Sequence, residues 1–311
     1  MKFITKELNG GIRTYTPSKY ENDILHIEHT SGPFSSATIA LQDIMIFYND
    51  CKKLPSSVIR RKQFGLCKIN MNDDNEDVTK VIYNENDYFS FEYDKERLVL
   101  DLPIIDVEQK VEGTYPAHGF YKDILFDDVY PFIKKYFMPG DEVMKKILLF
   151  EEKYKIDYEN TCIILYRGAD KLKETPIGSY DFFIDKAKSI GDENTVFFIQ
   201  TDEVEFLEEA RLKLSNVFYI EECQILPIDP HRSMFHKLES NLKMNHLINY
   251  FSSLIIGSKC KHVITHTGNG GFWLSLYKGD SKNLHQAVCG NTDRCGGVYH
   301  NSTCFNIWID S

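Results

Sequence analysis

The chain has 311 residues, of which 42% are hydrophobic and 13% aromatic, so it is long enough to bury a large core and to form two domains of ordinary size. Its 46 Asp and Glu residues outnumber its 36 Lys and Arg residues, the formal charge is −10, and no basic run of five or more occurs. A single small module is therefore excluded, and bulk electrostatic attraction to DNA, RNA or an anionic membrane is not expected.

The sequence favours a cytoplasmic protein. Residues 1–6 lack the apolar core of a signal peptide, and no window of 18 uninterrupted apolar residues occurs. The eight cysteines are widely spread, and Cys162 and Cys260 lie in or beside apolar runs, as reduced core cysteines do. We expect no transmembrane segment and no nucleic acid partner, and the sequence leaves the oligomeric state open.

The first predicted unit is a strand, a Gly/Ser loop and a helix. Residues 24–30 alternate like a strand, residues 31–36 break that pattern, and residues 37–48 carry apolar side chains at helical spacing. Ser35 and Ser36 end the loop, where hydroxyl groups can meet an anion or a sugar, although Ser36 also suits the N-cap of the helix. This pattern predicts the opening unit of a doubly wound domain.

Two acidic runs in the N-terminal half have to be weighed as cation sites. They are residues 72–77, between strand-like stretches at 64–69 and 88–93, and Asp127–Asp128. Charge runs of this kind are usually solvated. We interpret both as surface residues and predict no metal site there.

Pro139–Gly140 is the strongest boundary signal in the chain. An amphipathic helix is expected next, over residues 142–154. We predict an N-terminal α/β domain over residues 1–140 and a second domain over residues 141–280. The C-terminal segment 281–311 is expected to pack back on the body.

The second predicted domain alternates between apolar strands and amphipathic helices. We expect strands at 161–165, 195–200, 217–220 and 262–265, and helices at 180–190, 204–214, 242–256 and 271–278. Such alternation predicts a parallel sheet joined by right-handed crossovers. Residues 279–311 are expected to be rich in loops, with a strand-like stretch at 304–309.

Three loops that follow these strands carry polar residues suited to a nucleotide sugar. The loops after parallel strands open at the same edge of a sheet, where ligands bind in open α/β folds. The candidate residues are Arg167, Asp170, Lys171, Glu174, Thr201, Asp202, His266, Thr267, Gly268, Asn269 and Gly270.

The chemistry of these residue types points to an anion. Arg167 offers planar, bidentate donors to a diphosphate, and Lys171 offers a point charge. The glycines of the third loop permit close backbone approach, and the helix that follows would direct its first N–H groups at a ligand. Two alternatives remain open: the third loop is also a tight turn that begins a helix, and Asp202 with Glu205 also fits a capping pattern.

A cysteine- and histidine-containing segment near the C-terminus invites a zinc interpretation. Cys289, Cys295 and Cys304 lie there with His285 and His300. The spacings lack any paired Cys-x-x-Cys, which structural zinc sites usually contain. We therefore predict no metal ligands in this segment.

With these loops in view, the second domain resembles the donor-binding domain of the inverting GT-B fucosyltransferases, the α1,2-, α1,6- and protein O-fucosyltransferase superfamily. The sequence from Tyr166 to Lys171 is similar to the arginine motif of this family. Arg167 matches the arginine that holds the β-phosphate in the family, and Asp170 and Lys171 match the end of the motif. The second arginine of the family corresponds to Gly168 here.

Two further motifs extend the resemblance. Residues 199–202, which end in Thr201 and Asp202, are similar to the strand ending in Thr-Asp that forms the second motif. Residues 262–271 lie where the family has a small, hydroxyl-rich loop that opens a helix beside the pyrophosphate. The resemblance covers residues 160–280.

This resemblance implies an α/β fold of the GT-B type, with two Rossmann-like domains facing a cleft. Residues 1–140 would form the acceptor-side domain, and residues 141–280 would form the domain that binds the nucleotide sugar. It implies an inverting transfer of L-fucose from GDP-fucose to a glycan acceptor, without a metal or another cofactor. Arg167, Lys171 and the helix start at Gly270 would stabilise the leaving diphosphate, and Glu174, or else Asp170, would act as the general base. The alternatives are a transferase that uses another nucleotide sugar and a non-catalytic nucleotide- or glycan-binding protein.

Overall fold

The computed structural model of this chain describes most of the C-terminal half and several parts of the N-terminal half. The described residues are 6–8, 11–13, 19–21, 24–28, 33–51, 53–55, 57–61, 83–84, 119–168, 178–223, 225, 240–289 and 305–311.

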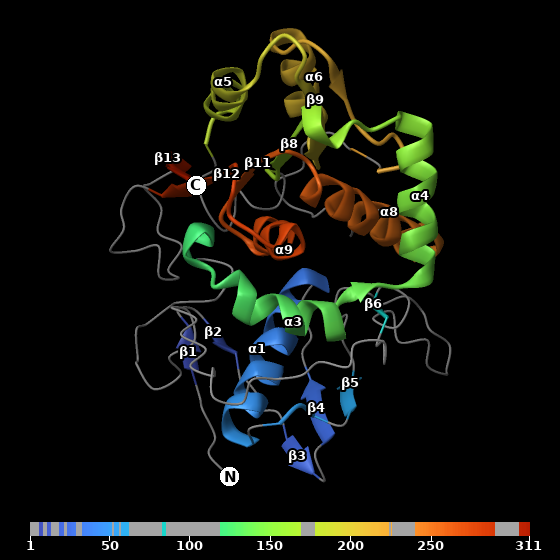
Figure 1. Ribbon diagram of the computed structural model, residues 1–311, viewed down its shortest axis with the longest axis vertical. Helices are drawn as coiled ribbons and strands as arrows, with labels where there is room; N and C mark the ends of the chain where they lie inside the picture. Colours follow the sequence, from blue (N-terminus) through green and yellow to red (C-terminus); the bar gives the residue numbers. More distant parts are fainter. Residues whose placement is uncertain are drawn as a thin grey trace.

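A six-stranded, mainly parallel sheet forms the centre of the C-terminal half (Figure 1). Its strands, in spatial order, are β10 (Val217–Phe218), β9 (Val196–Thr201), β8 (Thr161–Tyr166), β11 (His262–His266), β12 (Leu284–Cys289) and β13 (Phe305–Asp310). All neighbours are parallel except β13, which pairs with β12 in the antiparallel direction. From β8 the chain continues to β9 and β10 on one side of the sheet. It then returns to β11, beside β8, and continues to β12 and β13 on the other side, so the strand order reverses between β8 and β11.

Helices cover both faces of this sheet because its central strands are apolar on both sides. Cys162, Ile164 and Tyr166 of β8 pack into one buried cluster, and Ile163 and Leu165 pack into the other, as the two-residue period of a strand requires. The first cluster includes residues of α5 (Tyr180–Ile190) and α6 (Val204–Lys213). The second includes residues of α4 (Asp141–Tyr154), α8 (Ser240–Ser258) and α9 (Asn269–Lys278).

Among its described residues, the N-terminal half has a three-stranded sheet and two α-helices. The sheet has the order β3 (Lys19–Glu21), β4 (Ile24–Glu28) and β5 (Ser57–Arg61), and α1 (Pro33–Cys51) joins β4 to its parallel neighbour β5. The remaining elements are β1 (Lys6–Leu8), β2 (Gly11–Arg13), β6 (Tyr83–Asn84), η2 (Tyr121–Asp123), α3 (Phe126–Tyr136), β7 (Met138–Pro139) and η3 (Tyr158–Asn160). The strand and helix expected at the start of a doubly wound domain are therefore present in β4 and α1, and β5 adds a parallel strand that was not predicted.

Helix α1 begins earlier than the sequence pattern predicted. It starts at Pro33, so Ser35 and Ser36 lie in its first turn and not in a preceding loop. Proline suits the first turn of a helix because its φ is already close to the helical value and its missing N–H has no partner to lose there. The interpretation of Ser36 as an N-cap is therefore wrong.

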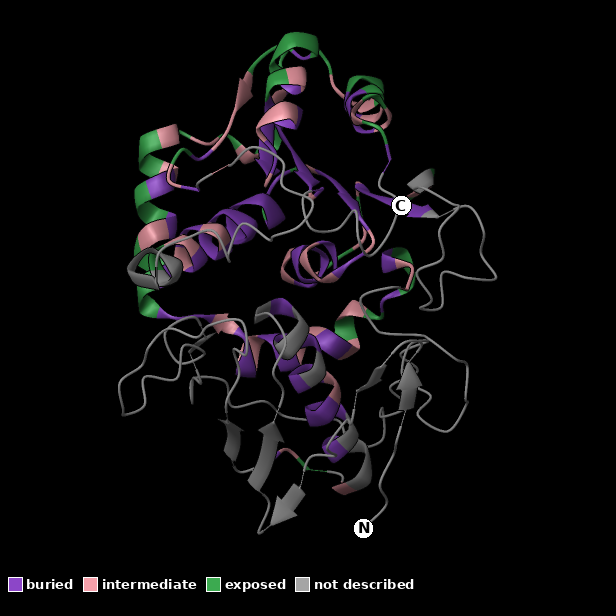
Figure 2. Cartoon of the chain, turned by 180° about the vertical axis from the view of Figure 1, so that it is seen from behind, coloured by how far each residue is buried: buried purple, intermediate pink, exposed green. Residues whose placement is uncertain are grey.

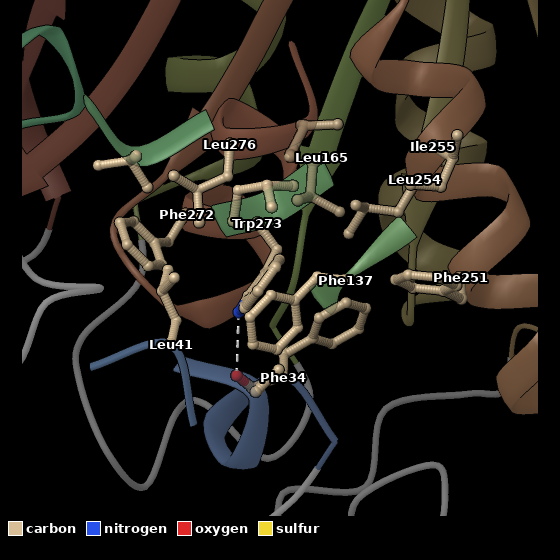
Figure 3. Close-up of a cluster of buried hydrophobic side chains, with 14 of the residues drawn as sticks. Phe34, Leu41, Phe137, Leu165, Phe251, Leu254, Ile255, Phe272, Trp273 and Leu276 are labelled. Carbon is tan, nitrogen blue, oxygen red and sulfur yellow. Dashed lines mark hydrogen bonds between the residues drawn. The ribbon is translucent and has the colours of Figure 1, made fainter. Parts of the chain in front are cut away.

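The helices of the two halves share one hydrophobic core around α9. Residues Gly271–Leu276 of α9 are all buried, and Trp273 lies against Phe137, with ring centroids 5.0 Å apart (Figure 3). The indole N–H of Trp273 lies 3.1 Å from the carbonyl oxygen of Phe34 and 3.0 Å from the hydroxyl oxygen of Thr38, both in α1. Figure 2 shows buried residues in the sheet, in α8 and α9, and in α1. The division of the chain into two domains at residue 140 stays a prediction.

Strand β12 was not predicted. Residues 284–289 fall in the segment that was expected to be rich in loops, and His285 and Gln286 interrupt their apolar pattern. Both side chains are nevertheless buried, and each has a hydrogen-bond partner. Buried polar residues thus hide an interior strand of the sheet from a hydropathy pattern.

The remaining N-terminal predictions divide into two groups. The strands expected at 64–69 and 88–93 and the acidic run at 72–77 lie outside the described residues. Asp127 and Asp128 lie in the first turn of α3, where the helix dipole favours carboxylates.

No helix within the described part of the chain has the length and hydropathy that crossing a membrane requires.

The contact between α9 and β11 leads to a prediction for stability. A Cβ atom on Gly271 would overlap the carbonyl oxygen of His266 and lie 2.5 Å from Thr265 Oγ1. We expect Gly271→Ala to lower the free energy of unfolding by about 1–3 kcal/mol, because a backbone oxygen cannot move aside without displacing the strand. Urea unfolding followed by circular dichroism measures this change.

Gly270→Ala is the matched control in the same helical turn. Its added Cβ would meet Tyr250 Oη at 3.3 Å and Leu165 Cδ2 at 3.5 Å, and alanine is the better helix former. We expect its stability to stay within about 1 kcal/mol of the parent chain. Equal stability of the two variants would contradict the packing argument.

Candidate functional site

The two predicted anion-binding loops leave the same edge of the sheet. Strands β8 and β11 are parallel neighbours, with Cys162 opposite His262 and Ile164 opposite Ile264. Arg167 follows the end of β8, and the loop to α9 follows the end of β11. The strand order reverses between these two strands, which is where open α/β sheets bind ligands.

The turn after β8 is held by a carboxylate from the neighbouring strand. Asp202 directly follows β9, and its Oδ1 accepts a hydrogen bond of 3.0 Å from the N–H of Gly168. Its Oδ2 lies 3.6 Å from Nε of Arg167, whose side chain remains 38% exposed. Asp202 is not the N-cap of α6, because Glu203 occupies that position and makes no side-chain cap. The capping alternative for Asp202 is therefore wrong.

Thr201 is buried at the end of β9. Its hydroxyl oxygen lies 3.1 Å from the backbone N–H of Glu203, from which it accepts a hydrogen bond. The side chain therefore shapes the turn that carries Asp202. A direct contact between Thr201 and a ligand stays a prediction.

The loop after β11 is fixed by backbone geometry and by hydrogen bonds. Gly268, the N-cap of α9, has a φ of 147°, a conformation that side-chain-bearing residues rarely adopt. Its N–H donates to the hydroxyl of Tyr121 at 2.8 Å, and that hydroxyl lies 2.9 Å from the carbonyl oxygen of Gly268, to which it donates. Thr267 donates through its N–H and its hydroxyl to the carbonyl oxygen of Ala287 in β12.

Tyr121 and Gln286 form a buried polar network behind this loop. The N–H of Tyr121 donates to Gln286 Oε1 at 2.8 Å, and Gln286 Nε2 lies 3.0 Å from both the carbonyl oxygen of Gly119 and the hydroxyl of Thr267. Burial raises the pKa of the Tyr121 hydroxyl far above its usual value, so the neutral phenol can donate and accept at once. Neither residue was predicted from the sequence, because their partners are remote in the chain and neither belongs to a motif.

Asn269 connects the start of α9 to the start of α1. Its Oδ1 lies 2.8 Å from the hydroxyl oxygen of Thr38, one turn along α1 from Ser35. The structure thus brings the first turns of α1 and α9 together, although the side chains of Ser35 and Ser36 are outside the described part. A helix start carries N–H groups without intrahelical partners and the positive end of the dipole, so Gly270 lies in a turn suited to an anion.

His266 lies on the other face of the sheet from α9. It is buried, its ring meets Phe183 of α5 edge-on with centroids 6.4 Å apart, and its Nδ1 lies 2.9 Å from the carbonyl oxygen of Thr267. These contacts give His266 a packing role beneath α5. Its contact with a nucleotide stays a prediction.

Several predicted residues lie outside the described part of the chain. They are Asp170, Lys171, Glu174, Cys295, His300 and Cys304. His285, from the segment weighed for zinc, has its Nδ1 2.7 Å from Asp310 Oδ1. Within the ranges that the structure describes, no three His, Cys, Asp or Glu side chains are grouped closely enough to hold a metal ion.

The network behind the third loop generates a prediction. Tyr121→Phe removes the hydroxyl that serves both polar groups of Gly268, and buried backbone groups left unpaired cost about 1–3 kcal/mol. We expect a loss of that size in the free energy of unfolding, measured by urea titration. Tyr130→Phe, on a partly exposed tyrosine of α3, is the control and should change stability by less than about 0.5 kcal/mol. An unchanged Tyr121→Phe variant would show that the loop is held in another way.

Comparison with known proteins gives limited information. No protein-family model matches the chain, and no curated protein matches it significantly. Among solved structures, NodZ alpha-1,6-fucosyltransferase co-crystallised with GDP is similar at 12% identity and a TM-score of 0.36, covering 53% of this chain and 49% of that one. The same enzyme soaked with GDP-fucose is similar at 12% identity and a TM-score of 0.35, covering 60% and 54%. The matched region spans about half of those chains, and likeness at this level carries no argument about function.

Proposed function

We propose that this chain is a glycosyltransferase that uses a nucleoside diphosphate sugar. The observation that supports the proposal is the placement of Arg167 and the start of α9 at one edge of the sheet, where the strand order reverses. A guanidinium and a helix start suit the two phosphates of such a donor. The formal charge of −10 makes a local site of this kind necessary for binding an anion.

The proposed reaction is one displacement at the anomeric carbon of the donor sugar. An acceptor hydroxyl forms the new C–O bond while the bond to the diphosphate breaks, and the diphosphate leaves with the electron pair. Arg167, Lys171 and the N–H groups of α9 would stabilise its developing charge. The hydroxyl proton would pass to a carboxylate, for which we propose Glu174, with Asp170 as the alternative.

The most specific form of the proposal is an inverting, metal-independent transfer of L-fucose from GDP-fucose to a glycan acceptor. It rests on the similarity of residues 166–171 and 199–202 to the fucosyltransferase motifs. Protein cations would take the role that a metal ion has in other transferases. Ser35 and Ser36, in the first turn of α1, would face the sugar or the acceptor. Transfer from another nucleotide sugar is the nearest alternative.

A binding protein without catalysis is the second candidate function. The observation that favours it is Gly168, which stands where the related family has a second arginine. Such a protein would bind the nucleotide without breaking the sugar–phosphate bond. Isothermal titration with GDP, followed by an assay for GDP-fucose hydrolysis and transfer, separates the two candidates: binding without either reaction supports the binding protein.

Removal of the guanidinium tests the donor site. We expect Arg167→Ala to lower turnover by about 100-fold or more, the usual scale for losing one group that stabilises a leaving anion. Steady-state kinetics with GDP-fucose measures this effect, and circular dichroism checks the fold. Arg211→Ala is the matched control. It removes an arginine of α6 that stacks on the ring of Tyr219, and it should keep full turnover. Activity of Arg167→Ala within a few-fold of the parent would mean that the donor site is elsewhere.

Chelation tests the absence of a metal requirement. Since protein cations are proposed to stabilise the diphosphate, activity should persist in excess EDTA. The measurement compares initial rates before and after chelation, and again after manganese is added. Complete loss of activity that manganese restores would support a metal-dependent transferase instead.

A further inference from the structure

Glu203 is a buried carboxylate beside the proposed donor site. Its side chain is 1% exposed, and its Oε2 accepts a hydrogen bond of 2.9 Å from the hydroxyl of Tyr180, the first residue of α5. A charge removed from water costs several kcal/mol unless the fold compensates it, so an apolar residue would be the simpler choice for packing alone. The buried charge therefore calls for an explanation beyond packing.

The carboxylate fills the space that Gly168 leaves open. A Cβ atom on Gly168 would overlap the side chain of Glu203, so the turn after β8 passes directly against this carboxylate. Asp202, the residue before Glu203, accepts a hydrogen bond from the N–H of the same glycine. Two consecutive carboxylates thus hold the turn that begins at Arg167.

Tyr180, which donates to this carboxylate, belongs to a cluster of aromatic rings. Tyr166 stacks on Phe206 with ring centroids 4.2 Å apart, and Tyr180 meets both rings edge-on at 5.4 Å. Burial raises the pKa values of Tyr166 and Tyr180, and the negative charge of Glu203 raises them further. Tyr180 therefore stays protonated and keeps donating its hydrogen to Glu203.

We propose that Glu203 is a positioning residue of the donor site, which acts through Arg167. The inference rests on the proposed function. By holding Tyr180 on one side and Gly168 on the other, Glu203 fixes the turn from which the guanidinium of Arg167 extends. Arg167 is next to Gly168 in the chain, and its side chain is 38% exposed, so it remains partly accessible to a ligand.

Charge and positioning predict opposite effects on diphosphate binding. A carboxylate near the site repels an anion, so its neutralisation alone would tighten binding. Loss of a positioning contact would weaken binding, because a small misplacement of a binding group is costly. The sign of the change in the dissociation constant therefore separates the two roles.

Two substitutions use this difference. Glu203→Gln keeps the size of the side chain but removes its charge and replaces one acceptor oxygen with a donor. Tyr180→Phe removes one hydroxyl and leaves every charge in place. We expect each to raise the dissociation constant for GDP about tenfold, the scale on which partners that orient a binding group act. Glu208→Gln, on an exposed carboxylate of α6, makes the same charge change and should leave GDP binding unchanged.

The measurement is isothermal titration with GDP, UDP and ADP, at a temperature where circular dichroism shows every variant folded. A purely structural role would lower the melting temperature and leave the dissociation constant of the folded protein unchanged. In an Arg167→Lys background the losses should not add, because Glu203 acts through residue 167. If Glu203→Gln does not fold, Tyr180→Phe decides the question.

The outcomes distinguish this inference from the proposed function. Suppose that the parent chain binds a nucleoside diphosphate and that Arg167→Lys weakens this binding. Unchanged binding by both Glu203→Gln and Tyr180→Phe would then overturn the positioning role of Glu203, while the donor site would still be supported. Tighter binding by Glu203→Gln also overturns it. If the parent chain binds none of the three nucleotides, the donor site fails, and the positioning role fails with it.

Discussion

Helix α9 and strand β11 approach each other so closely that residue 271 has no room for a side chain. This contact holds the first turn of α9 against the end of β11, where we propose that its first N–H groups bind the diphosphate. The same helix carries Trp273 into a core built from both halves of the chain, where its indole N–H meets α1. One packing constraint therefore determines both the proposed anion site and the attachment of the N-terminal helices.

Buried polar groups hold the loops around this helix start. Tyr121 pairs with both polar groups of Gly268, Gln286 links that tyrosine to Thr267, and Glu203 lies against the turn at Gly168. Each group costs desolvation energy and is compensated by specific partners, so these contacts favour one loop geometry over others that would be equally well packed. The proposed diphosphate site would benefit from such rigidity, because little ordering would then remain to be done on binding.

The sequence alone determined the elements of the second half and the residues from which a site could be built. The two-residue alternation of β8 and the helical periods of α5 and α6 are local signals, and the structure places these elements within a residue or two of the predicted bounds. The candidates Arg167 and Asp202 were found because charged residues after an apolar strand indicate a ligand edge. The start of α1 and strand β12 were misjudged where proline and buried polar residues altered the local pattern.

Only the tertiary structure decided which of these candidates lie together. The order of the strands places β11 beside β8, a pairing between segments about a hundred residues apart that no local pattern encodes. The support of the third loop by Tyr121 spans 147 residues, and the link from Thr38 to Asn269 spans 231. Hydrophobic periodicity reports which face of an element is buried, whereas a single hydrogen bond between remote residues leaves no periodic trace in the sequence. Composition and spacing therefore predicted most helices and strands of the second half. The hydrogen bonds that hold the loops of the site could be identified only from the tertiary structure.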